Sequence, residues 1–234
     1  MDALARLAAE PERAGIFLDV DGTLAPIVAN PGDARVPEAT RDVLRELARR
    51  YALVACVSGR SGEVAREIVG VPELTYVGEH GLELEPEAEH WASRIREFAA
   101  AAPWPTEDKP LTAAFHYRTS ADPAAARAVL EDVATAALDE GFRTRWGRMV
   151  LEVLPPVAAS KGTAVRRLLA RHELQRALFA GDDTTDLDGF RALDGLEAAV
   201  RVAVVSPEGP AELGEAADVV VGSTAALVDL LRQL

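Results

Sequence analysis

The sequence predicts an α/β protein: a core built on a parallel sheet, with a small α+β unit inserted into it. Two observations lead to this prediction. Short apolar runs rich in Val, Ile and Leu alternate with longer stretches of helical period, which is typical of βα units stacked on a parallel sheet. The middle of the chain breaks this alternation and ends in a strand, a helix and a hairpin. We therefore expect a discontinuous core of residues 1–85 and 158–234, with residues 86–157 inserted.

The expected core elements follow from the apolar runs and from helical periodicity. The helix that starts at Pro37, for example, has Leu44 and Leu47 on one face. The predicted core strands are Ile16–Val20, Leu53–Val57, Leu74–Val77, Ala177–Ala180, Val200–Val204 and Val219–Val221. The predicted core helices are Pro37–Arg50, Gly62–Val69, Lys161–Arg171, Thr184–Leu193 and Thr224–Leu231.

The inserted unit has its own pattern, and prolines mark its two ends, near Pro86 and at Pro155-Pro156. An alanine-rich helix is followed by the breaker cluster Pro103-Trp104-Pro105. The elements predicted for this unit are helices Glu89–Ala102 and Pro123–Glu140 and strands Leu111–Tyr117, Phe142–Trp146 and Met149–Leu154.

Composition and charge exclude several classes of function. The net charge of −13 argues against a general basic surface for nucleic acid or anionic membrane, so an anionic substrate would be captured by a metal and a few local cations. The four histidines lack the spacing of a zinc site, and the single cysteine, Cys56, is expected to be buried without a role. With no membrane-length apolar run and no signal peptide, we expect a cytoplasmic protein, and we expect a monomer.

Two aspartates follow the first predicted strand in the run Asp19-Val20-Asp21-Gly22-Thr23-Leu24. Ligands of an open parallel sheet bind beyond the carboxyl ends of its strands, so this is where an active site is expected. Two carboxylates one residue apart can serve as a nucleophile and an acid/base group at one phosphoryl centre. An ordinary turn or a calcium loop is the alternative for this run taken alone.

Two further residues stand at the starts of predicted helices. Ser58 follows the strand that ends at Val57, where it could bind phosphate or simply cap the next helix. Lys161 opens a helix, although the helix dipole favours cations at the other end, so a nearby anion is expected to compensate. A solvated surface lysine is the alternative.

Three carboxylates, those of Asp182, Asp183 and Asp186, lie within five residues after another strand. At about 4 Å a pair of like charges repels by roughly 4 kcal/mol at an effective dielectric of 20. A bound cation removes this conflict, and hard carboxylate oxygens suit Mg²⁺ better than zinc or copper. A simple helix cap would account for Asp183 but not for the whole cluster.

Taken in order, these four runs resemble the motifs of the haloacid dehalogenase (HAD) superfamily. The resemblance implies a Rossmann-like core, with Asp19 as the nucleophile and Asp21 as the acid/base. It implies that Ser58 and Lys161 contact the phosphoryl group, and that Gly22, Gly59 and Arg60 belong to the substrate site. The implied Mg²⁺ ligands are Asp19, the carbonyl of Asp21 and Asp182, with Asp183 and Asp186 as further ligands through water or as supporting groups.

The inserted unit resembles the α+β cap of the sugar-phosphate branch of this superfamily. Several runs are similar to the trehalose-6-phosphate phosphatase family in particular, among them Gly78-Glu79-His80-Gly81, Phe115-His116-Tyr117-Arg118 and the run from Gly147 to Val153. This family uses cap residues to bind the sugar hydroxyls, which implies sugar-binding roles here for Glu107, Lys109, His116, Arg118 and Glu152. Leu187 and Pro110 depart from the family's usual residues.

The expected substrate is therefore trehalose 6-phosphate. The alternatives are another sugar phosphate, such as sucrose 6-phosphate or mannosyl-3-phosphoglycerate, a phosphomutase reaction, or a catalytically inactive sugar-phosphate sensor.

Overall fold

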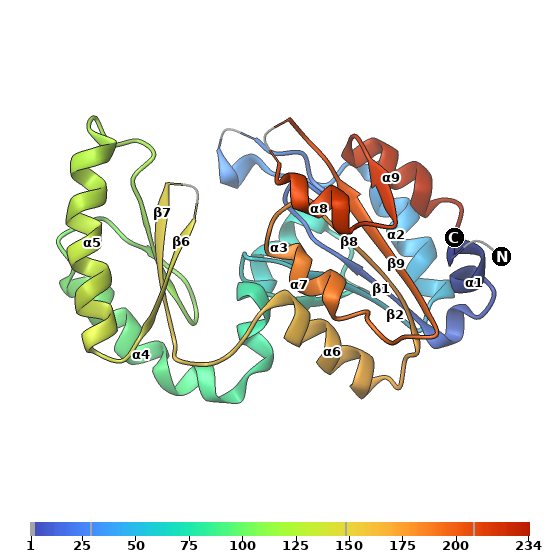
Figure 1. The fold of residues 1–234 in the computed structure, drawn as a ribbon, viewed down its shortest axis with the longest axis horizontal. Helices are drawn as coiled ribbons and strands as arrows, with labels where there is room; N and C mark the ends of the chain where they lie inside the picture. Colours follow the sequence, from blue (N-terminus) through green and yellow to red (C-terminus); the bar gives the residue numbers. More distant parts are fainter. Residues whose placement is uncertain (1–2, 29, 148, 208) are drawn as a thin grey trace. The chain divides into compact units, whose positions relative to one another are not determined.

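The computed structural model of the protein describes residues 3–28, 30–147, 149–207 and 209–234. Two compact units make up the chain (Figure 1). The core unit consists of Met1–Gly81 and Ala159–Leu234, and the insert unit is Leu82–Ala158. The α/β class predicted from the sequence is confirmed. None of the helices in the described part of the chain has the length and apolar character needed to cross a membrane.

A six-stranded sheet with parallel pairing organises the core unit, in the order β10-β9-β8-β1-β2-β3. β2 and β3 lie on one side of β1, and β8, β9 and β10 lie on the other. The strand order therefore reverses beside β1, and such a switch point is where an open sheet binds ligands. The strands are β1 (Ala14–Leu18), β2 (Leu53–Val57), β3 (Thr75–Val77), β8 (Arg176–Gly181), β9 (Ala198–Val204) and β10 (Val219–Val221).

Helices cover both faces of this sheet because the strands are apolar on both sides. Ile16 and Leu18 of β1 belong to a hydrophobic cluster shared with α1, α2, α3 and α9. On the other face, Phe179 of β8 meets Phe190 of α7 edge to face, with ring centroids 5.9 Å apart. The helices of the core unit are α1 (Ala3–Ala8), α2 (Glu38–Arg50), α3 (Gly62–Val69), α6 (Lys161–Arg171), α7 (Asp186–Arg191), α8 (Ala211–Ala216) and α9 (Thr224–Leu231).

Two helix starts near the sheet edge are fixed by serine caps. Ser160 accepts a hydrogen bond from the Thr163 amide, and the Thr163 hydroxyl accepts one from the Ser160 amide, which is a reciprocal capping box for α6. Ser61 caps α3, and Gly70 ends that helix in the left-handed conformation. Both helices therefore begin where the sequence predicted.

The insert unit has a four-stranded antiparallel sheet in the order β4-β5-β7-β6, with α4 and α5 packed on one face. Asp122 caps α5 by accepting hydrogen bonds from the amides of Ala124 and Ala125. The elements are α4 (Pro86–Ala101), β4 (Glu107–Asp108), β5 (Ala113–His116), α5 (Pro123–Asp139), β6 (Arg143–Gly147) and β7 (Val150–Leu154).

The structure corrects several predicted boundaries. β1 ends at Leu18 and not at Val20, because beyond Asp19 the chain turns into a short loop in which Val20 is buried without being part of a strand. The predicted helix from Thr184 to Leu193 forms only between Asp186 and Arg191. The prediction also missed α1, α8 and the two-residue strand β4.

Candidate active site

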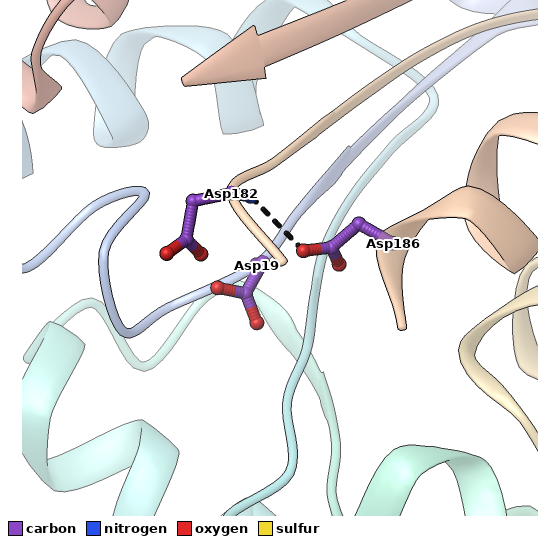
Figure 2. Close-up of side chains that lie close together, drawn as sticks. All are labelled: Asp19, Asp182 and Asp186. Atoms are coloured by element: carbon purple, nitrogen blue, oxygen red, sulfur yellow. Dashed lines mark hydrogen bonds between the residues drawn. The ribbon is translucent and has the colours of Figure 1, made fainter. Parts of the chain in front are cut away.

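The site lies at the carboxyl ends of the adjacent strands β1 and β8. Asp19 directly follows β1, and its amide continues the sheet ladder by donating to the Ala180 carbonyl (2.9 Å). Asp182 directly follows β8, and Asp186 is the first residue of α7. Each of these three aspartates offers one oxygen, and the three oxygens lie within 4.8 Å of one another (Figure 2). Residues far apart in the sequence thus form one carboxylate cluster.

Lys161, the first residue of α6, provides the cation for this cluster. Its Nζ lies 2.6 Å from Asp19 Oδ1 and 2.6 Å from Asp186 Oδ1, and the side chain is only 3% exposed. Burial alone would lower the pKa of Lys161, but the attraction of the two carboxylates outweighs burial and raises it. Lys161 therefore stays charged. The carboxylates of Asp19 and Asp186 are the nearby anions that were expected from the position of Lys161 at the start of a helix.

The carboxylates repel one another even with Lys161 present. Burial is the main cause that raises the pKa of Asp19, to about 6. The charge of Asp186 raises this pKa further, whereas the charge of Lys161 lowers it. Burial and the charges of Asp19 and Asp186 raise the pKa of Asp182 to about 8. One lysine does not balance three carboxylates, so this donor set fits a hard divalent cation such as Mg²⁺. Asp19 and Asp182 are the residues that would hold it.

Asp186 supports the cluster because both of its oxygens are already engaged. Oδ1 accepts from Lys161, and Oδ2 accepts from the backbone amides of Asp182 (3.0 Å) and Asp183 (2.9 Å). Asp186 is fully buried. It therefore fixes the loop that carries Asp182, and at the same time it orients Lys161.

Asp183 lies outside the three-carboxylate cluster. Its Oδ1 accepts hydrogen bonds from the amide (2.7 Å) and the hydroxyl (3.2 Å) of Thr184, and the residue is exposed. This is the local turn chemistry expected for an aspartate before a helix. Any contribution of Asp183 to a metal would have to be indirect in this arrangement.

Glycines allow the loops of the site to approach one another closely. Gly22 has φ +85°, and a Cβ at this position would lie 2.0 Å from Asp182 Oδ2. A Cβ at Gly181 would lie 2.2 Å from the carboxyl carbon of Asp186. The Gly22 amide donates to the Ala25 carbonyl (2.8 Å), so it stabilises the turn after Asp19. No larger residue could occupy these two positions without displacing the cluster.

Asp21 is paired with Arg60. The Arg60 Nε donates to Asp21 Oδ2 (2.7 Å) and its Nη2 donates to Oδ1 (2.6 Å), which is a two-pronged charge-assisted contact. Arg60 also donates to the Pro31 carbonyl (2.9 Å). The sequence prediction placed both residues in the site but did not pair them.

Ser58 follows β2 and is buried, and its hydroxyl accepts from the Arg60 amide (3.1 Å). The cap of α3 is Ser61, so capping does not explain Ser58. Next to it, a Cβ at Gly59 would lie 2.5 Å from His80 Nε2. The imidazole of His80 therefore lies directly against the Gly59 backbone.

The loop after β3 also contributes to the site, although the sequence analysis assigned it no site role. Glu79 (φ 48°) and His80 (φ 55°) are both left-handed, which is uncommon for residues other than glycine. The Glu79 amide donates to the Arg60 carbonyl and the His80 amide to the Ser58 carbonyl, both at 2.8 Å. This strained loop therefore braces the Ser58 turn. Its only sequence signal was the Gly78-Glu79-His80-Gly81 run.

Thr23 was also missed. It is fully buried, and its hydroxyl donates to Asp182 Oδ1 (3.3 Å). A threonine in an Asp-rich turn has no distinctive pattern, so the sequence gives no reason to link it with a residue so far along the chain.

In the insert unit, the predicted sugar-binding residues form two groups on the sheet. His116 Nε2 lies 2.6 Å from Glu107 Oε2, and Lys109 Nζ donates to Glu152 Oε1 (3.1 Å). Arg118 is exposed in the turn after β5. Arg148, within the run that resembles the sugar-phosphate phosphatases, lies outside the described residues.

Comparison with known proteins identifies the family of this chain. The sequence matches the family profile described as Trehalose-phosphatase over residues 17–104 and 105–217. The trehalose-phosphate phosphatase of Mycobacterium ulcerans is 31% identical over 212 residues, which cover 81% of this chain and 54% of that protein. Trehalose-phosphate phosphatase B of Arabidopsis thaliana is 30% identical over 217 residues, which cover 80% of this chain and 58% of that protein. The chain spans about half the length of these relatives.

Among solved structures, a trehalose-6-phosphate phosphatase of Aspergillus fumigatus superimposes with a TM-score of 0.69 and 25% identity, over 100% of this chain and 97% of that one. The HAD-like fold predicted from the four motifs is thereby confirmed. The family profile matches most of the sequence, and the solved trehalose-6-phosphate phosphatase has the same fold. This chain therefore belongs to the trehalose-phosphatase family.

Proposed function

We propose that this protein hydrolyses trehalose 6-phosphate to trehalose and inorganic phosphate, with Mg²⁺ as the cofactor and an aspartyl-phosphate on Asp19 as the intermediate. The observation that carries the proposal is the buried contact of Asp19 with Lys161 inside the three-carboxylate cluster, in a chain of the trehalose-phosphatase family.

Asp19 is the proposed nucleophile. Lys161 donates to its Oδ1, which leaves Oδ2 as the oxygen that attacks phosphorus. The bond between phosphorus and the sugar oxygen breaks as the aspartyl–phosphorus bond forms. Lys161 and the Ser58 hydroxyl are the proposed donors to the phosphoryl oxygens, where charge builds up in the transition state.

Asp21 is the proposed acid and base. It donates a proton to the departing sugar oxygen, and as a carboxylate it then takes a proton from the water that attacks phosphorus and releases Asp19. In this structure Arg60 occupies both oxygens of Asp21. The pairing therefore has to loosen when Asp21 receives or donates its proton, so Arg60 is proposed to control the position and charge of Asp21.

When bound at Asp19 and Asp182, Mg²⁺ would offset the carboxylate charge and act as a Lewis acid toward a phosphoryl oxygen. The Asp21 carbonyl is the third proposed ligand, and Asp186 is the proposed support.

The insert unit is proposed to act as the cap that selects the sugar. Glu107, Lys109, His116, Arg118 and Glu152 are the proposed partners of the sugar hydroxyls. Charged side chains suit this role, because hydrogen bonds from ionised groups are the stronger ones and a disaccharide offers many hydroxyls.

The test is phosphate release from a panel that contains trehalose 6-phosphate, sucrose 6-phosphate, mannosyl-3-phosphoglycerate, glucose 6-phosphate and p-nitrophenyl phosphate. The proposal predicts the highest kcat/KM for trehalose 6-phosphate, loss of activity in EDTA and recovery with Mg²⁺. A higher kcat/KM for another sugar phosphate would overturn the substrate. Full activity in EDTA would overturn the metal, and absence of turnover would favour a sensor.

A further inference from the structure

The face of the insert sheet opposite the α4 and α5 cluster carries a row of residues in register. Ala113 and Phe115 of β5, with Leu151 and Val153 of β7, face the hydrophobic cluster under α4 and α5. Because side chains alternate along a strand, the residues between them point to the opposite face. On that face the strand pairings align Glu107 with Ala114, Ala114 with Glu152, and Glu152 with Arg145.

Glu152 is held from two sides within this row. Lys109 Nζ donates to Oε1 (3.1 Å), whereas Arg145 donates to Oε2 through Nε (2.8 Å) and also through Nη2. The Glu152 side chain is only 13% exposed. A carboxylate this far removed from water depends on such hydrogen-bond partners to offset its loss of hydration.

Lys109 reaches Glu152 across a neighbouring strand. Its backbone amide donates to the Thr112 carbonyl (3.2 Å), so Lys109 extends the pairing of β4 with β5, while Glu152 is on β7 beyond β5. Arg145 approaches Glu152 from β6, on the other side. The three charges therefore form a chain across all four strands.

We infer that Arg145 is a positioning residue for sugar recognition, which acts through Glu152. The inference rests on the proposed function of the insert unit. Arg145 donates to one oxygen of Glu152 through two nitrogens and so holds that oxygen in place. Lys109 Nζ can then donate to a sugar hydroxyl and Glu152 Oε1 can accept from one, with the two atoms held 3.1 Å apart. Fixing both groups before the sugar arrives lowers the ordering cost of binding.

The alternative is that the pair of Arg145 and Glu152 only joins β6 to β7. A double-mutant cycle separates the two roles, because residues that act through one another give non-additive effects. The variants are Arg145→Met, Glu152→Gln and the double variant. Arg145→Lys keeps the charge without the two-pronged geometry, and it replaces Arg145→Met in the cycle should the latter fail to fold.

The matched control is Arg127→Met. Arg127 lies on α5, pairs with Glu131 and stacks over Trp146 at 4.5 Å, so its loss removes one arginine from the helix side of the same unit. For each variant kcat and KM are measured with the sugar phosphate that the wild type hydrolyses best and with p-nitrophenyl phosphate. Thermal unfolding of each variant provides the structural readout.

We expect Arg145→Met to lower kcat/KM for the sugar phosphate roughly tenfold, mainly through KM, and to leave p-nitrophenyl phosphate unchanged. Arg145→Lys should fall in between. In the Glu152→Gln background, the change at Arg145 should have little further effect, and Arg127→Met should resemble the wild type on both substrates.

Equal losses on both substrates, no loss, or a full additional loss in the Glu152→Gln background would each overturn the inference. The same data separate it from the proposed function. Preference of the wild type for a sugar phosphate other than trehalose 6-phosphate contradicts the trehalose assignment, while the cycle on that preferred substrate still decides the role of Arg145. Lack of any preference for sugar phosphates over p-nitrophenyl phosphate contradicts both.

Discussion

Arg60 holds both carboxylate oxygens of Asp21, with Nε 2.7 Å from Oδ2 and Nη2 2.6 Å from Oδ1. The Arg60 amide also donates to the Ser58 hydroxyl, so one residue links the proposed acid/base with the proposed phosphate-binding serine. These contacts support the proposed effect of Arg60 on the proton transfers at Asp21, in addition to the substrate-binding role that the family resemblance implied.

Replacement of Arg60 by lysine should lower kcat on both trehalose 6-phosphate and p-nitrophenyl phosphate, by roughly ten- to a hundredfold. Lysine keeps the charge but cannot donate two parallel bonds to Asp21. Arg66→Lys is the control, because Arg66 lies on α3 and donates to the Pro72 carbonyl. A rise in KM at constant kcat would instead show that Arg60 only binds the substrate.

Gly22→Ala should damage the proposed metal site. The new Cβ would lie 2.0 Å from Asp182 Oδ2, at a φ of +85° that alanine rarely adopts. The strained backbone alone should destabilise the fold by about 1–3 kcal/mol. Displacement of Asp182 should raise the Mg²⁺ concentration that gives half-maximal activity.

Gly32→Ala is the matched control for this variant, because a Cβ there meets nothing within 4 Å. Magnesium titrations of activity, with thermal unfolding of both variants, make the comparison. An unchanged Mg²⁺ requirement in Gly22→Ala would mean that Asp182 does not hold the metal.

The carboxylate cluster predicts how the stability of the metal-free protein depends on pH. Folding raises the pKa of Asp19 from 3.8 to about 6 and that of Asp182 to about 8. Between pH 4 and 8 the folded state therefore binds more protons than the unfolded state at these two groups, so their contribution to stability falls as the pH rises. In EDTA, the Tm should decrease between pH 5 and 8.

Two comparisons check this assignment. Asp182→Asn removes one of the charges that repel, so it should be more stable than the wild type at pH 8 in EDTA and show a flatter decrease of Tm. Mg²⁺ should raise the wild-type Tm more at pH 8 than at pH 5, because it binds ionised carboxylates in the folded state. A decrease of Tm as steep in Asp182→Asn as in the wild type would contradict the assignment.

Local signals in the sequence were sufficient for most of the core unit. The apolar run predicted the bounds of β2, and helical periodicity predicted those of α3. β4 could not be found in this way, because its two residues, Glu107 and Asp108, are charged and become a strand only through pairing with β5. α7 is shorter than predicted because Asp183 and Thr184 form a turn before it begins.

For the site, the four motifs predicted which strand ends meet, but not which side chains contact one another. The spacing of Asp182, Asp183 and Asp186 could not show that Asp183 turns away to Thr184 while Asp186 binds Lys161. The role of Thr23 depends on contacts between distant parts of the chain, and the left-handed Glu79 and His80 depend on the loops around them. Tertiary structure decides such contacts, and one sequence carries little information about them.

The proposed mechanism requires Asp19 to attack phosphorus, and its test is phosphate release from trehalose 6-phosphate by Asp19→Asn in saturating Mg²⁺. Asp188→Asn is the control, because it makes the same change at an aspartate that pairs with Arg191 on α7. We expect Asp19→Asn to fold and to lose at least roughly a thousandfold in kcat, since an amide is not a nucleophile, and Asp188→Asn to stay near the wild type. Substantial turnover by a folded Asp19→Asn protein would show that Asp19 is not the nucleophile.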